Sequence, residues 1–256
     1  MTLPAPEEKA RVVREMFDRI APSYDAMNVL MTGGLDRIWR RRLIRACRIQ
    51  AGDLVVDLGC GTGDLIELAA RAGGRPVGVD PAGGMLAIAR QRGMGATVVQ
   101  GDAAAIPLAD GSVQVVISAF ALRNFLAIPP VFAEAARVLA PCGRLALLEV
   151  AEPRIALIRA LHGFYFRRVV PAIGGLFSDR EAYRYLPEST SYLPVPEELC
   201  AMLAAAGFTR IQRVSLGAGA VQLLSAELAP ASAGTSATDA RARTSGEEPA
   251  SAGGGQ

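Results

Sequence analysis

The stretch Val55-Val56-Asp57-Leu58-Gly59-Cys60-Gly61-Thr62-Gly63-Asp64 decides how this chain folds. It predicts a buried strand that passes through a glycine-rich turn into a helix. Glycines such as Gly59 and Gly61 let the backbone adopt positive φ and approach a ligand with no Cβ in the way. The carboxylate of Asp57 can bind an ammonium and the first N–H groups of the helix can bind a carboxyl group, so the turn suits a zwitterionic amino acid. A tight turn without any ligand is the alternative.

Two further acids follow the next two predicted strands. Asp80 ends the second strand, where a carboxylate can accept hydrogen bonds from both hydroxyls of a ribose. Asp102 follows the third strand and, with the backbone N–H of Ala103, offers polar groups to an adenine edge. Nicotinamide enzymes share the first acid, whereas the turn, Asp80 and Asp102 together describe S-adenosylmethionine. Taken singly, each acid could equally be a surface or capping residue.

Apolar strands and segments of helical period alternate along residues 1–228, which is typical of an α/β fold. Residues 216–219 are too few for a crossover helix between the last two strands, so these strands should pair antiparallel at the sheet edge. We expect a Rossmann-like class I methyltransferase fold, with a seven-stranded, mostly parallel sheet and an antiparallel C-terminal edge hairpin. The expected strands are 54–58, 76–80, 97–100, 113–119, 143–150, 210–215 and 220–227, and the expected helices are 8–20, 35–47, 64–72, 83–92, 129–139 and 196–206.

Composition restricts the class of protein. A chain of 256 residues with 51% hydrophobic residues can bury one sizeable core, and a net charge of +2 provides no general field for nucleic acid. No CxxC pair occurs, and the N-terminus lacks the apolar segment of a signal peptide, so we expect a cytoplasmic protein with reduced thiols. The single histidine, His162, predicts no metal cluster and is expected to be a neutral, partly buried residue. The cysteines are Cys47, Cys60, Cys142 and Cys200.

The pattern is that of one domain, residues 1–228, with two additions. Residues 152–194 interrupt the alternation and are longer than an ordinary strand–helix connection, so we expect a helical insertion that covers the substrate. Residues 229–256 are rich in Ala, Ser, Gly and Thr and contain no large apolar residue to bury. This composition predicts a disordered tail, because ordering it would cost entropy without burial in return.

Three motifs outside the glycine-rich turn resemble those of one enzyme family. They are Phe17-Asp18-Arg19-Ile20-Ala21-Pro22-Ser23-Tyr24-Asp25-Ala26-Met27-Asn28, Phe120-Ala121-Leu122-Arg123-Asn124 and Ala182-Tyr183-Arg184-Tyr185-Leu186-Pro187-Glu188-Ser189. Many small-molecule methyltransferases share the glycine-rich turn, but few combine it with these motifs. From about residue 16 to residue 224 the chain is similar to the ubiquinone/menaquinone biosynthesis C-methyltransferase family.

The resemblance implies a reaction and a set of site residues. The expected reaction transfers a methyl group from S-adenosylmethionine to a ring carbon of a lipid-soluble prenylated quinol, in menaquinone or ubiquinone biosynthesis. Ala119 stands where the family usually has Ser, so a side-chain hydrogen bond is lost there, and Gln114 stands where an acid is frequent. The implied cofactor contacts are Thr62, Asp80, Asp102, Ala103 and Ala119, beside Asp57, Gly59 and Gly61 of the turn, and the implied ring-pocket residues are Tyr24, Arg123 and Asn124.

The expected roles of the ring-pocket residues follow from quinol chemistry. A dihydroxylated ring becomes a carbon nucleophile when one hydroxyl loses its proton, and positive charge near that oxygen favours the ionised form. We expect Arg123 to stabilise the phenolate, directly or through a water that removes the proton, while Tyr24 and Asn124 position the ring oxygens. The alternatives are a structural ion pair for Arg123, a core position for Tyr24 and a capping role for Asn124.

Residues 155–177 are apolar and aromatic but are interrupted by arginines and by Pro171, so they would span a membrane poorly. We expect them to lie on the inner face of a membrane, where arginines beside apolar surface would give access to a prenyl tail. A homodimer contact or ordinary core packing is the alternative. Two other functions also fit the sequence: methylation of a soluble small molecule, and a catalytically idle cofactor-binding subunit of a quinone-synthesis assembly.

Overall fold

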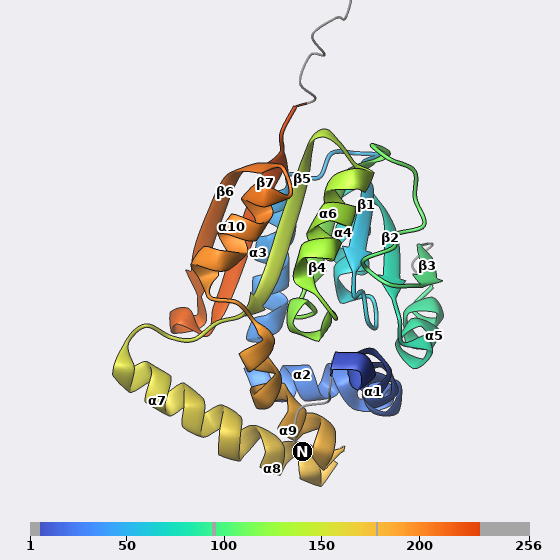
Figure 1. Cartoon of the computed structure of the whole chain (residues 1–256). Helices are drawn as coiled ribbons and strands as arrows, with labels where there is room; N and C mark the ends of the chain where they lie inside the picture. The colour runs from blue at the N-terminus through green and yellow to red at the C-terminus, as the bar shows by residue number, and fades with distance from the viewer. Residues whose placement is uncertain (1–5, 94–95, 178, 231–256) are drawn as a thin grey trace, which may run out of the picture.

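The computed structural model describes residues 6–93, 96–177 and 179–230, which form a seven-stranded sheet with helices on both faces (Figure 1). The strand order is β3-β2-β1-β4-β5-β7-β6; β1 to β5 pair parallel, and β7 pairs antiparallel with both β5 and β6. This topology confirms the predicted fold, including the C-terminal hairpin. The strands are β1 (Leu54–Leu58), β2 (Arg75–Asp80), β3 (Thr97–Gln100), β4 (Val113–Ala119), β5 (Leu139–Val150), β6 (Phe208–Leu216) and β7 (Val221–Leu228).

The two faces of the sheet bury separate apolar clusters because alternate side chains of each strand point to opposite faces. Val56 of β1 belongs to one cluster, with residues of α6 and α10, whereas Val55 belongs to the other, with residues of α3 and α4. Strands buried on both faces read as continuous apolar runs, which is why β1 and β4 were recognisable in the sequence. The helices that flank the sheet are α3 (Leu35–Cys47), α4 (Asp64–Arg71), α5 (Gly83–Gln91), α6 (Ile128–Val138) and α10 (Pro196–Ala205).

A second layer of helices lies beyond the carboxyl ends of the parallel strands (Figure 1). A third apolar cluster joins Met16, Met27, Met85, Val170 and Tyr185, and thereby packs α1, α2 and α5 together with the helices that follow β5. The members of this layer are α1 (Pro6–Ile20), α2 (Tyr24–Thr32), α7 (Ala156–Phe164), the π-helical segment Tyr165–Val169, α8 (Val170–Phe177), α9 (Arg180–Ser189) and the short 3-10 helix Thr190–Tyr192. None of the described helices is both long and apolar enough to cross a membrane.

Several predicted boundaries were wrong. The helix α2 was not predicted, because only Met27 of its nine residues is buried and the segment shows no clear apolar period. It ends at Gly33, which adopts a left-handed φ of 59°. Strand β5 begins at Leu139 rather than at residue 143, and β6 begins at Phe208 rather than at residue 210. Of the tail predicted to be disordered, residues 231–256 lie outside the described part of the chain.

Candidate active site

The glycine-rich turn lies at the carboxyl end of β1 and presents an unpartnered buried carboxylate. Asp57 is 1% exposed, and its Oδ1 atom has no hydrogen-bond partner among the described residues. Burial raises the pKa of Asp57 to about 8, although the nearby guanidinium of Arg40 acts in the opposite direction. A buried acceptor without a partner is costly, so this carboxylate fits a ligand that brings an ammonium group.

The turn needs its glycines for two different reasons. Gly59 and Gly61 have φ values of +70° and +54°, which residues with a Cβ rarely adopt. A Cβ on Gly59 would also lie 2.6 Å from the Cβ of Ala121, whereas a Cβ on Gly61 would meet no described atom within 4 Å. The first glycine therefore allows close packing against the segment that follows β4, and the second leaves open space beside the backbone for a ligand.

Asp80 closes the turn from the neighbouring strand. Its Oδ2 accepts a hydrogen bond from the N–H of Gly61 at 2.9 Å, and its Oδ1 accepts one from the N–H of Ala82 at 2.8 Å. Burial raises the pKa of the Asp80 carboxyl, and the two N–H donors partly offset this by favouring the ionised form. Each carboxylate oxygen retains acceptor capacity, so Asp80 can hold the turn and still bind ribose hydroxyls.

The remaining predicted cofactor residues lie at the ends of β3 and β4. Asp102 is exposed and accepts a hydrogen bond from the N–H of Ala104 at 2.9 Å, while Ala103 is buried. Ala119 is buried at the end of β4; the hydroxyl of Ser118 donates to the carbonyl of Leu58 at 2.6 Å and so does not replace the missing serine. Since β3, β2, β1 and β4 are neighbours, their carboxyl ends bring the predicted cofactor residues to one edge of the sheet.

Thr62 forms a hydrogen bond with Asp25, a residue to which the sequence analysis assigned no role. Its hydroxyl donates to Oδ1 of Asp25 at 2.6 Å, so toward a cofactor this hydroxyl can only accept a hydrogen bond. Asp25 also forms an ion pair with Arg92, which binds Asp64 at 2.8 Å. This network ties α2 to the start of α4. Asp25 could have been identified from its position inside the Tyr-Asp-x-Met-Asn motif.

Arg123 forms a buried ion pair, which is the structural alternative that the sequence allowed. Its guanidinium contacts the carboxylate of Glu149, and the two side chains are 7% and 0% exposed. The same Nη1 atom donates to the carbonyl of Phe120 at 2.9 Å, whereas the buried Nε has no partner among the described residues. Sequence analysis missed Glu149; an acid that directly follows the apolar run Leu145–Leu148 of β5 was the available signal.

Asn124 and Tyr24 contact the second helical layer. The hydroxyl of Tyr185 donates to Oδ1 of Asn124 at 3.3 Å, and burial raises the pKa of Tyr185 to about 12. Tyr24 is half-buried and packs against the same apolar cluster that contains Tyr185, with its ring edge-to-face on Phe17 at 6.0 Å between centroids. The bond between Tyr185 and Asn124 connects two of the three family motifs.

A buried lysine of α1, Lys9, contacts the segments that contain Phe125 and Tyr192. Lys9 is 5% exposed; its Nζ donates to the carbonyl of Phe125 at 2.6 Å and lies 3.9 Å from the ring centroid of Tyr192. Burial lowers the pKa of this lysine. The signal in the sequence was its spacing, since Lys9 lies on the same helical face as the buried Val13 and Met16.

Comparison with known proteins identifies the family. Residues 5–226 match the ubiE/COQ5 methyltransferase family. The chain belongs to this family. It is therefore an S-adenosylmethionine-dependent methyltransferase, as the sequence predicted, and Asp57, Gly61 and Asp80 offer groups that fit that cofactor.

Curated relatives align with most of this chain. The demethylmenaquinone methyltransferase of Roseiflexus sp. (strain RS-1) is 43% identical over 86% of this chain and 95% of its own length. That of Thermus thermophilus is 44% identical over 81% and 98%. The ubiquinone/menaquinone biosynthesis C-methyltransferase UbiE of Geotalea uraniireducens is 38% identical over 83% and 94%. A possible histamine N-methyltransferase from Thermotoga maritima, 18% identical over 84% of this chain and 99% of that one, superposes with a TM-score of 0.61 and shows the shared fold.

Proposed function

We propose that this ubiE/COQ5-family enzyme methylates a ring carbon of a polyprenyl quinol precursor, demethylmenaquinol or the corresponding demethyl benzoquinol, in menaquinone or ubiquinone biosynthesis. One contact carries the proposal. The segment that holds Arg123 and Asn124 packs on the cofactor turn so closely that a Cβ on Gly59 would lie 2.6 Å from the Cβ of Ala121. Groups that can bind a ring oxygen are thus held beside the turn that binds the methyl donor.

The cofactor-binding roles follow from the carboxyl edge of the sheet. Asp57 binds the ammonium, Asp80 binds the ribose, and Asp102 with the N–H of Ala103 binds adenine. Gly59, Gly61, Thr62 and Ala119 form the surrounding wall through backbone and small side chains. When bound, S-adenosylmethionine supplies an electrophilic methyl sulfonium, so the protein has to bind it and make the acceptor carbon nucleophilic.

In the proposed mechanism, Arg123 stabilises the phenolate. Glu149 fixes the guanidinium by one edge, and the unpartnered Nε of Arg123 donates toward the phenolate oxygen. Because guanidinium stays protonated, the phenolic proton leaves through water. Asn124, oriented by Tyr185, and the hydroxyl of Tyr24 position the ring oxygens. Transfer joins a cation and an anion, so exclusion of water and alignment of the reacting atoms provide much of the acceleration.

We assign the catalytic domain to residues 1–228, with residues 152–194 as a substrate cover, and place the enzyme in the cytoplasm, on the inner face of the membrane. Support for membrane contact comes from α7, where Leu157, Leu161 and Phe164 share one helical face and are 71%, 63% and 61% exposed. Co-sedimentation with vesicles that contain anionic lipid should depend on these side chains; dimerisation through them in lipid-free solution would support the homodimer alternative.

The test of the proposed reaction is transfer of a labelled methyl group to reduced demethylmenaquinone and to the demethyl benzoquinol. We expect transfer to at least one ring, and we expect Arg123→Ala to lose it while S-adenosylmethionine still binds. Binding of the cofactor without transfer to either ring would contradict the proposal. Transfer that Arg123→Ala leaves unchanged would contradict the role of the arginine and keep the reaction.

A further inference from the structure

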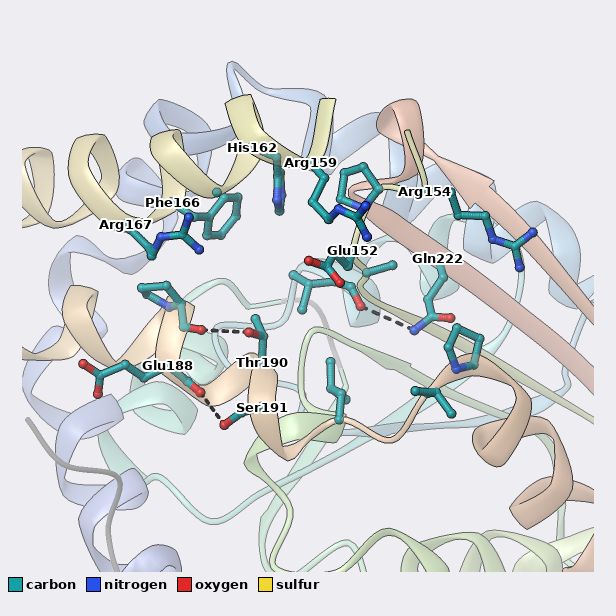
Figure 2. A pocket seen from close by; sticks show the side chains of 18 of the residues that line it. Glu152, Arg154, Arg159, His162, Phe166, Arg167, Glu188, Thr190, Ser191 and Gln222 are labelled. Carbon is teal, nitrogen blue, oxygen red and sulfur yellow. Dashed lines mark hydrogen bonds between the residues drawn. The ribbon is translucent and has the colours of Figure 1, made fainter. Parts of the chain in front are cut away.

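A large cavity lies between α7 and the segment that contains α9, beyond the end of β5 (Figure 2). Its volume is about 980 Å³, at the upper end of the range of about 300–1,000 Å³ for small-molecule sites. None of the proposed cofactor-binding residues lines it. The cavity is therefore distinct from the methyl-donor site and is large enough for a substantial organic group.

The inner wall of the cavity is partly apolar, and Glu152 and Gln222 are among its polar side chains. Phe166 and His162 project into it from the α7 side, with their ring centroids 4.5 Å apart (Figure 2). Burial lowers the pKa of His162, so the neutral imidazole is favoured at physiological pH. Other half-buried or buried wall residues are Val150, Pro153, Pro187 and Leu193. The apolar part of this wall suits a hydrocarbon group.

Arginines outnumber acids around the cavity, where Glu152, Glu188 and Glu197 are the acids. Arg159, Arg167 and Arg184 are exposed, and none of them has an ion-pair partner among the described residues. Figure 2 shows Arg159 and Arg167 pointing from the α7 side into the cavity, with Arg159 toward Glu152. Exposed guanidinium groups around a partly apolar interior match a ligand that enters from an anionic lipid surface, because their charges can face phosphates while their stems line the entrance.

The cavity also adjoins the proposed ring pocket through the backbone. The N–H of Val150, a wall residue, donates to Oε1 of Glu149 at 2.9 Å, and Glu149 holds Arg123. On the opposite wall, Pro187 lies two residues after Tyr185, which binds Asn124. The cavity therefore lies next to the residues that are proposed to bind the ring.

We infer that this cavity binds the isoprenoid chain of the acceptor, an inference that rests on the proposed function and adds a second substrate subsite to it. The chain enters past the arginines, packs against the apolar part of the wall and holds the ring in place. Each CH₂ buried in this way contributes about 0.8 kcal/mol, or roughly fourfold in binding constant. Acceptors with longer chains should bind more tightly until the cavity is full.

The test introduces a large side chain at the edge of the cavity, where it occupies part of the space. Ala160 is exposed and lines the cavity, so Ala160→Trp should occupy part of it without disturbing the core. Ala204 is exposed on α10 and does not line the cavity, so Ala204→Trp is the matched control. For each protein, the KM for a tail-less demethyl naphthoquinol and for its geranylgeranyl derivative is compared, together with the Kd for S-adenosylmethionine.

We expect Ala160→Trp to raise the KM of the geranylgeranyl acceptor about tenfold or more. The KM of the tail-less acceptor, the Kd of the cofactor and all values for Ala204→Trp should stay near wild type. If Ala160→Trp changes the KM of both acceptors equally, or changes neither, the inference is wrong. Turnover by the wild type would still support the proposed function in that case. If wild type methylates no quinol, that function fails, and equilibrium dialysis of labelled farnesol decides the inference: binding weakened by Ala160→Trp supports a prenyl site, and unchanged or absent binding refutes it.

Discussion

Loss of the Glu149 carboxylate should destabilise the protein more when Arg123 is present than when it is absent. Removing one partner of a buried ion pair costs about 3–5 kcal/mol, because the other charge stays buried without compensation. The side chains of Arg123 and Glu149 are 7% and 0% exposed, so solvent cannot replace the lost partner. We expect Glu149→Gln and Arg123→Met each to lower the free energy of unfolding by about 3 kcal/mol.

Urea denaturation of the two single variants and the double variant gives the coupling energy. The double variant should be destabilised by at least about 2 kcal/mol less than the sum of the single variants, because it leaves no isolated charge. The control is the surface pair Arg210–Glu227, where Arg210 is 76% exposed and Glu227→Gln should cost about 1 kcal/mol or less. Additivity within about 0.5 kcal/mol for the buried pair would refute the reasoning.

Two further predictions concern the cofactor turn. Since the pKa of Asp57 is raised to about 8, its contribution to folding stability is present below its unfolded pKa of 3.8 and is lost as the pH rises through about 8. Binding of an ammonium needs the ionised form, so calorimetry should show cofactor affinity rising by up to about tenfold per pH unit toward pH 8, and Asp57→Asn should abolish this rise. Gly59→Ala, which combines left-handed φ with the 2.6 Å contact to Ala121, should lower the free energy of unfolding by about 2–5 kcal/mol in urea titrations. Gly61→Ala has only the strained φ and should cost about 1–2 kcal/mol, so equal losses would contradict this account.

The sequence predicted those parts of the fold whose signals are local. Strand β1 was predicted with its observed bounds, Leu54–Leu58, because an apolar run ends there at a glycine. Helix α3 was also predicted with its observed bounds, Leu35–Cys47, because it alternates apolar and basic residues with helical period after Gly34. The short link between the last two strands also predicted their antiparallel pairing, whereas the order of the strands was not predicted.

Which polar residues bind each other could not be predicted, because these pairs join distant parts of the chain. Arg123 and Glu149 are 26 positions apart, and Thr62 and Asp25 are 37 apart. The sequence shows that these polar residues exist near predicted strand ends and motifs, but not which of them meet. Strand β5 pairs with β4 and thereby brings Glu149 to Arg123. Helix α2 lies over the turn and thereby brings Asp25 to Thr62.

The N-terminal helices are held over the cofactor turn by polar contacts at three separate points. Asp18 accepts a hydrogen bond from the N–H of Gly84 at 2.7 Å, Asp25 accepts one from Thr62 at 2.6 Å, and Lys9 donates to the Phe125 carbonyl at 2.6 Å. Water can replace each of these hydrogen bonds when the helices move away from the sheet. Together the three bonds therefore stabilise the observed position of the helices by only roughly 2–4 kcal/mol. The apolar cluster around Met16 resists separation more strongly. Hydrogen bonds and apolar packing together therefore hold the N-terminal helices against the carboxyl end of the sheet.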